Sequence, residues 1–289
     1  EIPASQFRVA GGLTFAGLNG EPEGVWNRDT NNFMPRIGFA YHVTPKTVIR
    51  AGYGIFFAFQ GVRRGDVVQS GYSFTTNLVP TLDGVNYIAT IANPFPNGIT
   101  EPTGASLGAA TLLGQGITFF EPNLKTPYNQ RWQFSIQREL PGRTVLELTY
   151  AGNRGTAIEI TRNLSSIPLQ YLSRSPARDN ERNAYLTANL PNPFAGLLPG
   201  TGRTGANISR QSLLALYPQF TGVSTTTNQG YSTYHSFAIE VDRRFSKGLT
   251  IQGGYTWSKF MEATAYLNGA DPLPAYTISD QDRPHRLSM

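Results

Sequence analysis

The feature that most constrains the fold is a strict alternation of apolar and polar residues. In the stretch LTIQGGYTWSK, Leu249, Ile251, Tyr255 and Trp257 lie in one phase, and threonine, glutamine, glycine and serine fill the other. Successive side chains of a β-strand point to opposite faces, so this pattern predicts a strand with one apolar face. The question is whether a protein core or lipid covers that face.

Two further stretches repeat the pattern, and each of the three forms a hairpin around a three-residue connector, TPK, PGR or SKG. Proline, glycine and lysine in such connectors are ordinary turn residues. An earlier stretch, FRVAGGLTF, has the same phase, and RPHRLSM resembles the start of one more strand. The expected strands lie near residues 6–16, 35–43, 47–59, 130–140, 144–157, 233–245, 249–261 and 284–289.

The connections between hairpins are far longer than the turns within them. Residues 60–128, 158–231 and 262–283 lack sustained periodicity and are rich in proline, glycine and asparagine; a short helix within RQSLLALYPQF is the helical element that we expect there. Connections beyond about 12–15 residues are uncommon in compact domains. Transmembrane barrels, by contrast, combine short periplasmic turns with long extracellular loops. We therefore expect an all-β, antiparallel up-and-down meander, with residues 1–289 forming part of a large transmembrane β-barrel.

The composition agrees with strands joined by loops. Hydrophobic residues make up 39% and charged residues 15%, while the chain holds 30 glycines and 20 prolines. No stretch approaches the roughly 18 apolar residues of a membrane-spanning helix. A barrel strand needs only about 9–11 residues and leaves an alternating trace instead. Lipid is therefore the favoured neighbour of the apolar face.

The two phases of the strands predict two kinds of surface. Aromatic residues gather at the strand ends next to the long connections, where an interfacial girdle is expected; they are Tyr53, Phe57, Trp132, Tyr150, Tyr255 and Trp257. Charged residues in the opposite phase are expected to face the lumen, either pairing with one another or lining a solute path; they are Arg36, Arg50, Glu147, Glu240, Asp242 and Arg244. Val48 and Phe56 are apolar exceptions in this phase.

Signatures of catalysis and of cofactor binding are missing from the sequence. The chain has no cysteine, and its three histidines, His42, His235 and His285, lie in separate segments without metal-ligand spacing. The stretch GTGRTG lacks the preceding strand and following helix that a nucleotide fingerprint requires. The net charge of +5 is scattered, which gives nucleic-acid binding little support. We expect no enzyme, no catalytic residue, no metal site and no cofactor.

Four stretches in order resemble a known family: NNFMPRIGFAYHVTPKTVIRAGYGIFF, PYNQRWQFSIQRELPGRTVLELTYAGNRGT, RRFSKGLTIQGGYTWSK and ISDQDRPHRLS. They resemble the barrel of TonB-dependent receptors, above all the Oar-like branch of Acidobacteria, whose members often carry an N-terminal carboxypeptidase-regulatory-like domain. The resemblance covers nearly the whole chain. It implies a barrel of about 22 strands around a plug, and thus an internal fragment of a longer protein.

The resemblance also implies a location and a function. The full-length protein would lie in the outer membrane of a Gram-negative bacterium, in contact with lipid, the plug and the remaining strands. It would bind a scarce solute, such as a ferric chelate, a saccharide or a peptide, and admit it with energy from TonB–ExbB–ExbD. The alternatives are a surface adhesion or structural protein of the outer membrane, and a soluble β-rich carbohydrate-binding module.

Overall fold

The computed structural model describes residues 9–58, 69–246 and 249–289, with the backbone alone at 244–246 and 249. Its contacts divide the chain into two compact units. The sheet unit comprises Trp26–Gly65, Glu121–Arg162 and Thr226–Met289. The loop unit comprises Glu1–Val25, Asp66–Phe120 and Asn163–Thr225.

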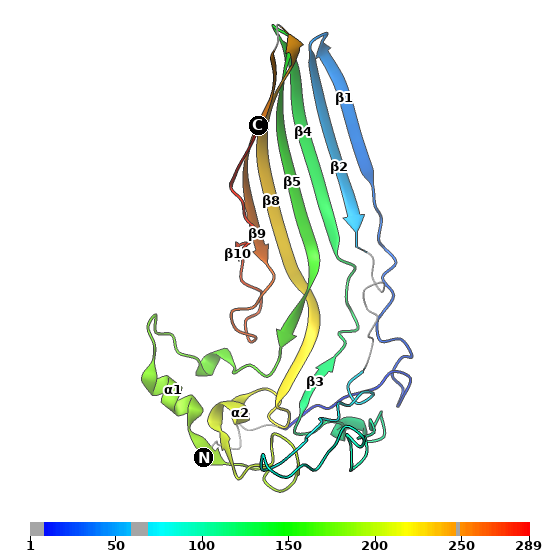
Figure 1. Cartoon of the computed structure of the whole chain (residues 1–289), viewed down its shortest axis with the longest axis vertical. Helices are drawn as coiled ribbons and strands as arrows, with labels where there is room; N and C mark the ends of the chain where they lie inside the picture. Colours follow the sequence, from blue (N-terminus) through cyan, green and yellow to red (C-terminus); the bar gives the residue numbers. More distant parts are fainter. Residues whose placement is uncertain (1–8, 59–68, 247–248) are drawn as a thin grey trace. The chain divides into compact units, whose positions relative to one another are not determined.

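The sheet unit is built on an antiparallel meander in which the long strands are neighbours in chain order (Figure 1). The order is β1-β2-β4-β5-β8-β9-β10, and β11 also pairs with β9. The strands are β1 Arg36–Thr44, β2 Thr47–Phe57, β4 Tyr128–Leu140, β5 Thr144–Asn163, β8 Gly222–Ser246, β9 Leu249–Ala263, β10 Thr277–Ile278 and β11 His285–Ser288. This arrangement confirms the predicted all-β meander.

The connections at the two ends of the strands differ in length. β1 and β2 are joined by residues 45–46, and β4 and β5 by residues 141–143. In the second turn Gly142 and Arg143 both have left-handed backbones, with φ of 79° and 58°. Glycine adopts this conformation without steric cost, so Gly142 suits the turn. The opposite ends lead into residues 58–127 and 164–221.

Most strands lie within a few residues of their expected positions, but two are longer. β5 extends to Asn163, and β8 begins at Gly222 rather than near residue 233. The added part of β8, GVSTTTNQGYS, is rich in threonine and has no apolar alternation, so the hydrophobic pattern did not reveal it. β-Branched threonine nevertheless suits a strand.

The expected strand at 6–16 is wrong over residues 9–16, which form no strand; residues 6–8 lie outside the described part of the chain. Leu13 and Phe15 are instead buried in the core of the loop unit, together with Ile117, Phe220 and Val223. Their shared phase thus reflects burial in a compact unit rather than a place in the sheet.

The long connections are not structureless, which corrects the expectation of simple loops. In the loop unit β3 (Gly116–Phe119) runs parallel to the start of β8, and β6 (Asn189–Pro191) pairs with β7 (Asn207–Ser209). The helical elements are η1 Gly108–Ala110, η2 Leu169–Tyr171, α1 Asn180–Thr187 and α2 Arg210–Leu214. The short helix expected within RQSLLALYPQF corresponds to α2. Among the described residues no helix is both long and apolar enough to cross a membrane.

Candidate functional site

The strand register gathers the apolar phase of every long strand on one side of the sheet, here called the apolar face. Phe39 lies opposite Ala51, which lies opposite Phe134, and Ile239 lies opposite Tyr255. The exposed fractions of Phe39, Phe134, Ile239 and Ile251 are 58%, 43%, 37% and 45%. Soluble monomers rarely expose contiguous apolar patches larger than a few hundred Å². The side chains that would form a sandwich core are thus uncovered in the described structure.

All six residues expected in the aromatic girdle lie in the phase of the apolar face. The hydroxyl of Tyr53 donates to Oε1 of Gln130 over 3.0 Å, and the rings of Phe57 and Tyr128 are 5.2 Å apart. Trp257 is 59% exposed. The geometry therefore groups these residues on one face; their place at a membrane interface stays a prediction.

Two histidines join the girdle, a role that the sequence analysis missed. The ring of Tyr150 stacks on His235, and its hydroxyl lies 2.8 Å from the histidine Nδ1. Tyr255 and His285 repeat this pair, with a distance of 2.7 Å between the same atoms. Each histidine lies in the same phase as the aromatic residues, which was the available signal. An amphipathic ring with a polar tip is suited to a membrane boundary.

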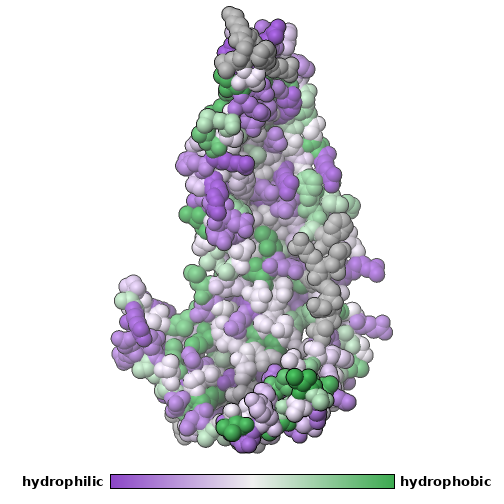
Figure 2. Space-filling model, viewed as in Figure 1, coloured by the Kyte–Doolittle hydropathy of each residue, from purple (hydrophilic) through white to green (hydrophobic). Residues whose placement is uncertain are grey.

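The opposite side of the sheet, here called the polar face, carries the charged residues expected in the lumen. Arg36, Arg50, Glu147, Glu240 and Asp242 all occupy its phase in the register. The Arg244 side chain lies outside the described residues. Figure 2 shows hydrophilic residues interspersed with apolar ones over the upper part of the sheet in the view drawn. Four of these residues lie in two places: Glu147, Glu240 and Asp242 line one pocket, and Arg36 lines another.

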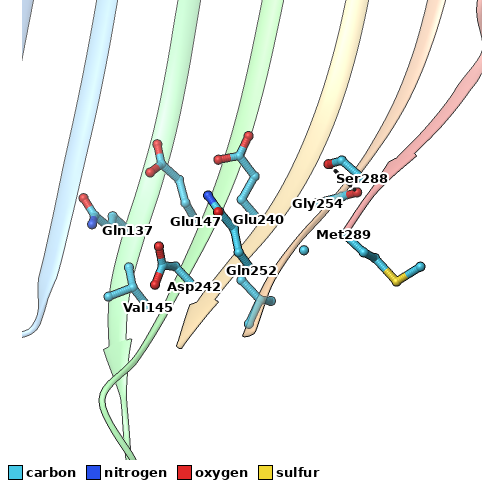
Figure 3. Close-up of a pocket in the computed structure, with 11 residues that line it drawn as sticks. Gln137, Val145, Glu147, Glu240, Asp242, Gln252, Gly254, Ser288 and Met289 are labelled. Atoms are coloured by element: carbon cyan, nitrogen blue, oxygen red, sulfur yellow. Dashed lines mark hydrogen bonds between the residues drawn. The ribbon is translucent and has the colours of Figure 1, made fainter. Parts of the chain in front are cut away.

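The first place is an acidic pocket of about 530 Å³ near the short turns (Figure 3). Glu147 of β5 and both Glu240 and Asp242 of β8 line it, with Gln137 of β4 and Gln252 of β9 beside them. Among the described residues no basic side chain forms an ion pair with these three carboxylates. The pocket therefore presents three carboxylates together with amide groups.

Arg50 stands beside this pocket but does not pair with its carboxylates. Its Nη1 donates to Oε1 of Gln137 over 2.6 Å. The amide thus lies between the guanidinium and the acidic pocket, and it satisfies one of the five arginine donors. Arg50 is the one candidate lumen residue whose described side chain forms a hydrogen bond to a neighbouring strand.

The second place is an arginine groove of about 450 Å³, lined by Arg36, Phe56 and Arg131. The guanidinium carbons of the two arginines lie 4.7 and 5.6 Å from the centroid of the Phe56 ring. This contact accounts for an apolar residue in the polar phase. The sequence analysis did not single out Arg131, although its phase relative to Trp132 already placed it on the polar face.

Both faces can bind other molecules through noncovalent contacts. The polar face combines carboxylates, guanidinium groups, amides and glycine backbone, which are groups that hold a polar solute. Among the described residues no three histidine, aspartate or glutamate side chains are grouped so that they could hold a metal ion. The groups present on the polar face are thus suited to noncovalent recognition of a polar solute.

The model of the outer membrane beta barrel domain family matches residues 3–289. The chain belongs to this family. Its location is accordingly the outer membrane of a Gram-negative bacterium, as predicted, and this location implies contact with lipid.

One solved structure similar to this outer membrane β-barrel chain is the outer membrane transporter YddB from Escherichia coli. The two share 10% sequence identity with a TM-score of 0.36, and the match covers 80% of this chain. The chain spans only 20% of the length of that transporter. No curated protein matches the chain.

Proposed function

We propose that this chain is part of the wall of a TonB-dependent, Oar-like outer-membrane receptor that admits a scarce solute to the periplasm. In this assignment the apolar face meets lipid and the polar face lines the interior. The observation that carries it is the asymmetry of the sheet. One face exposes Phe39, Phe134, Ile239 and Ile251, whereas the other holds an acidic pocket and an arginine groove.

The dimensions of the apolar face support a transmembrane wall. On β4, apolar-phase residues run from Trp132 to Leu140, roughly 27 Å along the strand at about 3.4 Å per residue, or about 19–22 Å in height at the usual strand tilt of roughly 35–45°. Outer-membrane barrels expose an apolar band about 25 Å tall between aromatic girdles. Arg138 interrupts this series beside the short turn, where its long side chain can reach the headgroup region. A soluble carbohydrate-binding module would cover such a face with a second layer.

The transport part of the proposal rests on the polar face and on the family resemblance. Among the described residues the carboxylates of the acidic pocket and the arginines of the groove form no ion pair, and charged groups of this kind suit a path that binds a solute weakly and selectively. In this proposal the plug and the remaining strands belong to the full-length protein, which contacts the separate TonB–ExbB–ExbD complex. The Oar-like resemblance adds an N-terminal carboxypeptidase-regulatory-like domain. The solute would be a ferric chelate, a saccharide or a peptide, and no covalent chemistry is needed.

An uptake assay tests this proposal. The full-length protein is expressed in the outer membrane of a Gram-negative host, once with TonB and once with TonB deleted. Cells are then given a radiolabelled ferric catecholate, a labelled oligosaccharide and a labelled peptide. We expect one probe to enter only when both the protein and TonB are present. Equal entry in both hosts, or entry no greater than with an empty vector, would refute transport by this route.

Surface adhesion is a second candidate, because part of the loop unit is apolar and uncovered. Leu82, Val85, Tyr87 and Ile91 are 83%, 77%, 77% and 103% exposed. Such residues in a long connection suit contact with another surface. Cell aggregation that disappears with Leu82→Ser and Tyr87→Ser, but persists without TonB, would favour adhesion over uptake.

A further inference from the structure

The arginine groove is organised around a glycine. Arg36 of β1 and Arg131 of β4 are the register partners of Gly54 on β2, one on each side. Glycine leaves a gap in this row, and the ring of Phe56 lies over it. A Cβ at Gly54 would stand 2.9 Å from Cε2 of Phe56 and 3.5 Å from Cγ of Arg36. The ring is therefore held between two guanidinium groups because residue 54 has no side chain.

Among the described residues no carboxylate forms an ion pair with Arg36 or Arg131. In the described part of the chain both guanidinium groups contact the Phe56 ring, whereas Lys259 forms its ion pair with Asp282 elsewhere. A guanidinium over an aromatic face keeps its in-plane N–H donors available. Two such groups around one ring repel each other, and an anion between them relieves that repulsion. Planar carboxylates and phosphates match the guanidinium fork with two parallel hydrogen bonds.

The groove has room for a small solute. Its volume of about 450 Å³ lies within the range of roughly 300–1,000 Å³ that is usual for ligand pockets. Gly52 and Gly54 leave its floor without side chains, and Gln133, Asn153 and Tyr234 add polar groups along its sides. These neutral donors and acceptors can bind the uncharged part of a ligand once the arginines hold its anionic group.

The acidic pocket makes the polar face selective by sign. Glu147, Glu240 and Asp242 lie nearer the short turns than the Arg36–Gly54–Arg131 row. An anion is attracted to the groove and repelled by the pocket, whereas a neutral saccharide responds to neither charge. The position of Arg36 and Arg131 away from these carboxylates therefore points to an anionic ligand at the arginine groove.

We infer that the arginine groove is a binding site for a small solute bearing carboxylate or phosphate groups, with Arg36 and Arg131 as its two ligands and Phe56 as the residue that positions them. This inference rests on the proposed function, because it requires that the polar face be reached by solutes. It narrows the expected solute, a ferric chelate, a saccharide or a peptide, to one that carries an anionic group.

A titration tests the site directly. The full-length protein in phosphatidylcholine nanodiscs is titrated with citrate, inorganic phosphate and the neutral sugar maltotriose. We expect citrate to bind, to bind more weakly as salt increases, and to lose at least about tenfold in affinity in the R36Q/R131Q double variant. The R36K/R131K variant keeps the positive charge but not the two-pronged hydrogen-bonding geometry. Its citrate affinity should therefore lie between that of the wild type and that of R36Q/R131Q.

Arg50→Gln is the matched control, because it removes one positive charge from the same face at a residue already bonded to Gln137. It should leave citrate affinity within about twofold. Heat-dependent migration on a denaturing gel shows whether each variant still folds. The site would be overturned if citrate bound the double variant as tightly as the wild type, or if the folded wild type did not bind citrate. Stronger binding of maltotriose than of citrate would overturn it as well.

A second arm separates this inference from the proposed function. Anionic phosphatidylglycerol replaces phosphatidylcholine in the nanodiscs, and citrate affinity should stay the same if the groove faces the interior. Competition by the lipid would mean that the polar face meets the bilayer, which would overturn the facing assignment and with it the site. TonB-dependent uptake that is unaffected by R36Q/R131Q would overturn the site alone.

Discussion

Trp132 and Gly152 are direct partners in the register of β4 and β5, and the indole lies over the glycine. A Cβ on residue 152 would overlap with Cε2, Nε1 and Cζ2 of the ring. The same ring lies 5.9 Å from the ring of His235 on β8. The missing side chain therefore lets the indole cross β5 and reach the next strand.

The first prediction concerns this contact. Gly152→Ala should lower the free energy of unfolding by about 1–3 kcal/mol, because the added methyl group displaces the indole and its contact with His235. The measurement is a urea titration of the full-length protein in lipid. Gly38→Ala is the control, since its Cβ would meet only Ala51 O, at 3.5 Å. Equal losses in the two variants would contradict the close approach of Trp132.

The second prediction tests which face meets lipid. Ile251→Arg should cost about 2–4 kcal/mol if residue 251 lies near the bilayer midplane. Gln252→Arg should cost less, because residue 252 lies beside Glu240 and Asp242 in the acidic pocket. Refolding titrations into lipid vesicles measure both. A larger loss for Gln252→Arg would reverse the facing assignment.

The third prediction concerns the two tyrosine–histidine pairs. Tyr150→Phe and Tyr255→Phe should each lower stability by about 0.5–1.5 kcal/mol, because each removes a hydrogen bond to Nδ1 and keeps the stacked ring. Tyr41→Phe serves as the control, since Tyr41 is 64% exposed and its hydroxyl has no hydrogen-bond partner among the described residues. If all three variants unfold in lipid at the same denaturant concentration, the hydrogen bonds to the histidines contribute nothing to stability.

The fourth prediction concerns pH and the loop unit. Hydrogen bonds from the backbone N–H groups of Asn86 and Val85, and from side chains of Asn86 and Thr81, hold the pKa of Asp83 well below its usual value of 3.8. Because the pKa is lowered in the folded state, the turn is stabilised above the ordinary pKa and loses this contribution as pH falls through the lowered one.

The carboxyl carbon shift of Asp83 in NMR spectra should therefore titrate below pH 3.8, and the amide shifts of Val85 and Asn86 should follow it. Asp83→Asn should abolish the pH response of both amides. Titration of the Asp83 carboxyl at or above its usual pKa would show that the turn does not form.

Local patterns predicted the long hairpins because strand phase is a local property. The alternation of Leu249, Ile251 and Tyr255 already fixes which residues share a face, and the register of β9 with β8 only adds their partners. Helix α1 was missed because its residues, NERNAYLT, have no apolar periodicity. It begins where Asp179 accepts a hydrogen bond from the Arg182 N–H.

The remaining features depend on contacts between distant segments. The burial of Phe15 against Phe220 joins the two ends of the loop unit, and no local pattern encodes it. The arginine groove required the pairing of β1 and β4 with β2, since Arg36 and Arg131 become neighbours only across Gly54. Phe56 is an apolar exception in the polar phase of its strand, and the two guanidinium groups that contact its ring account for it.

The outer edge of β1 has a consequence for biogenesis. Among the described strands β1 pairs with β2 alone, so a line of backbone amide and carbonyl groups points away from the sheet. Hydrocarbon offers these groups no substitute for water, and each one left open there costs several kcal/mol, in the order of about 2–7. Entry of this hairpin into the bilayer is therefore coupled to the docking of another strand along Arg36–Thr44, which makes folding and insertion a single event.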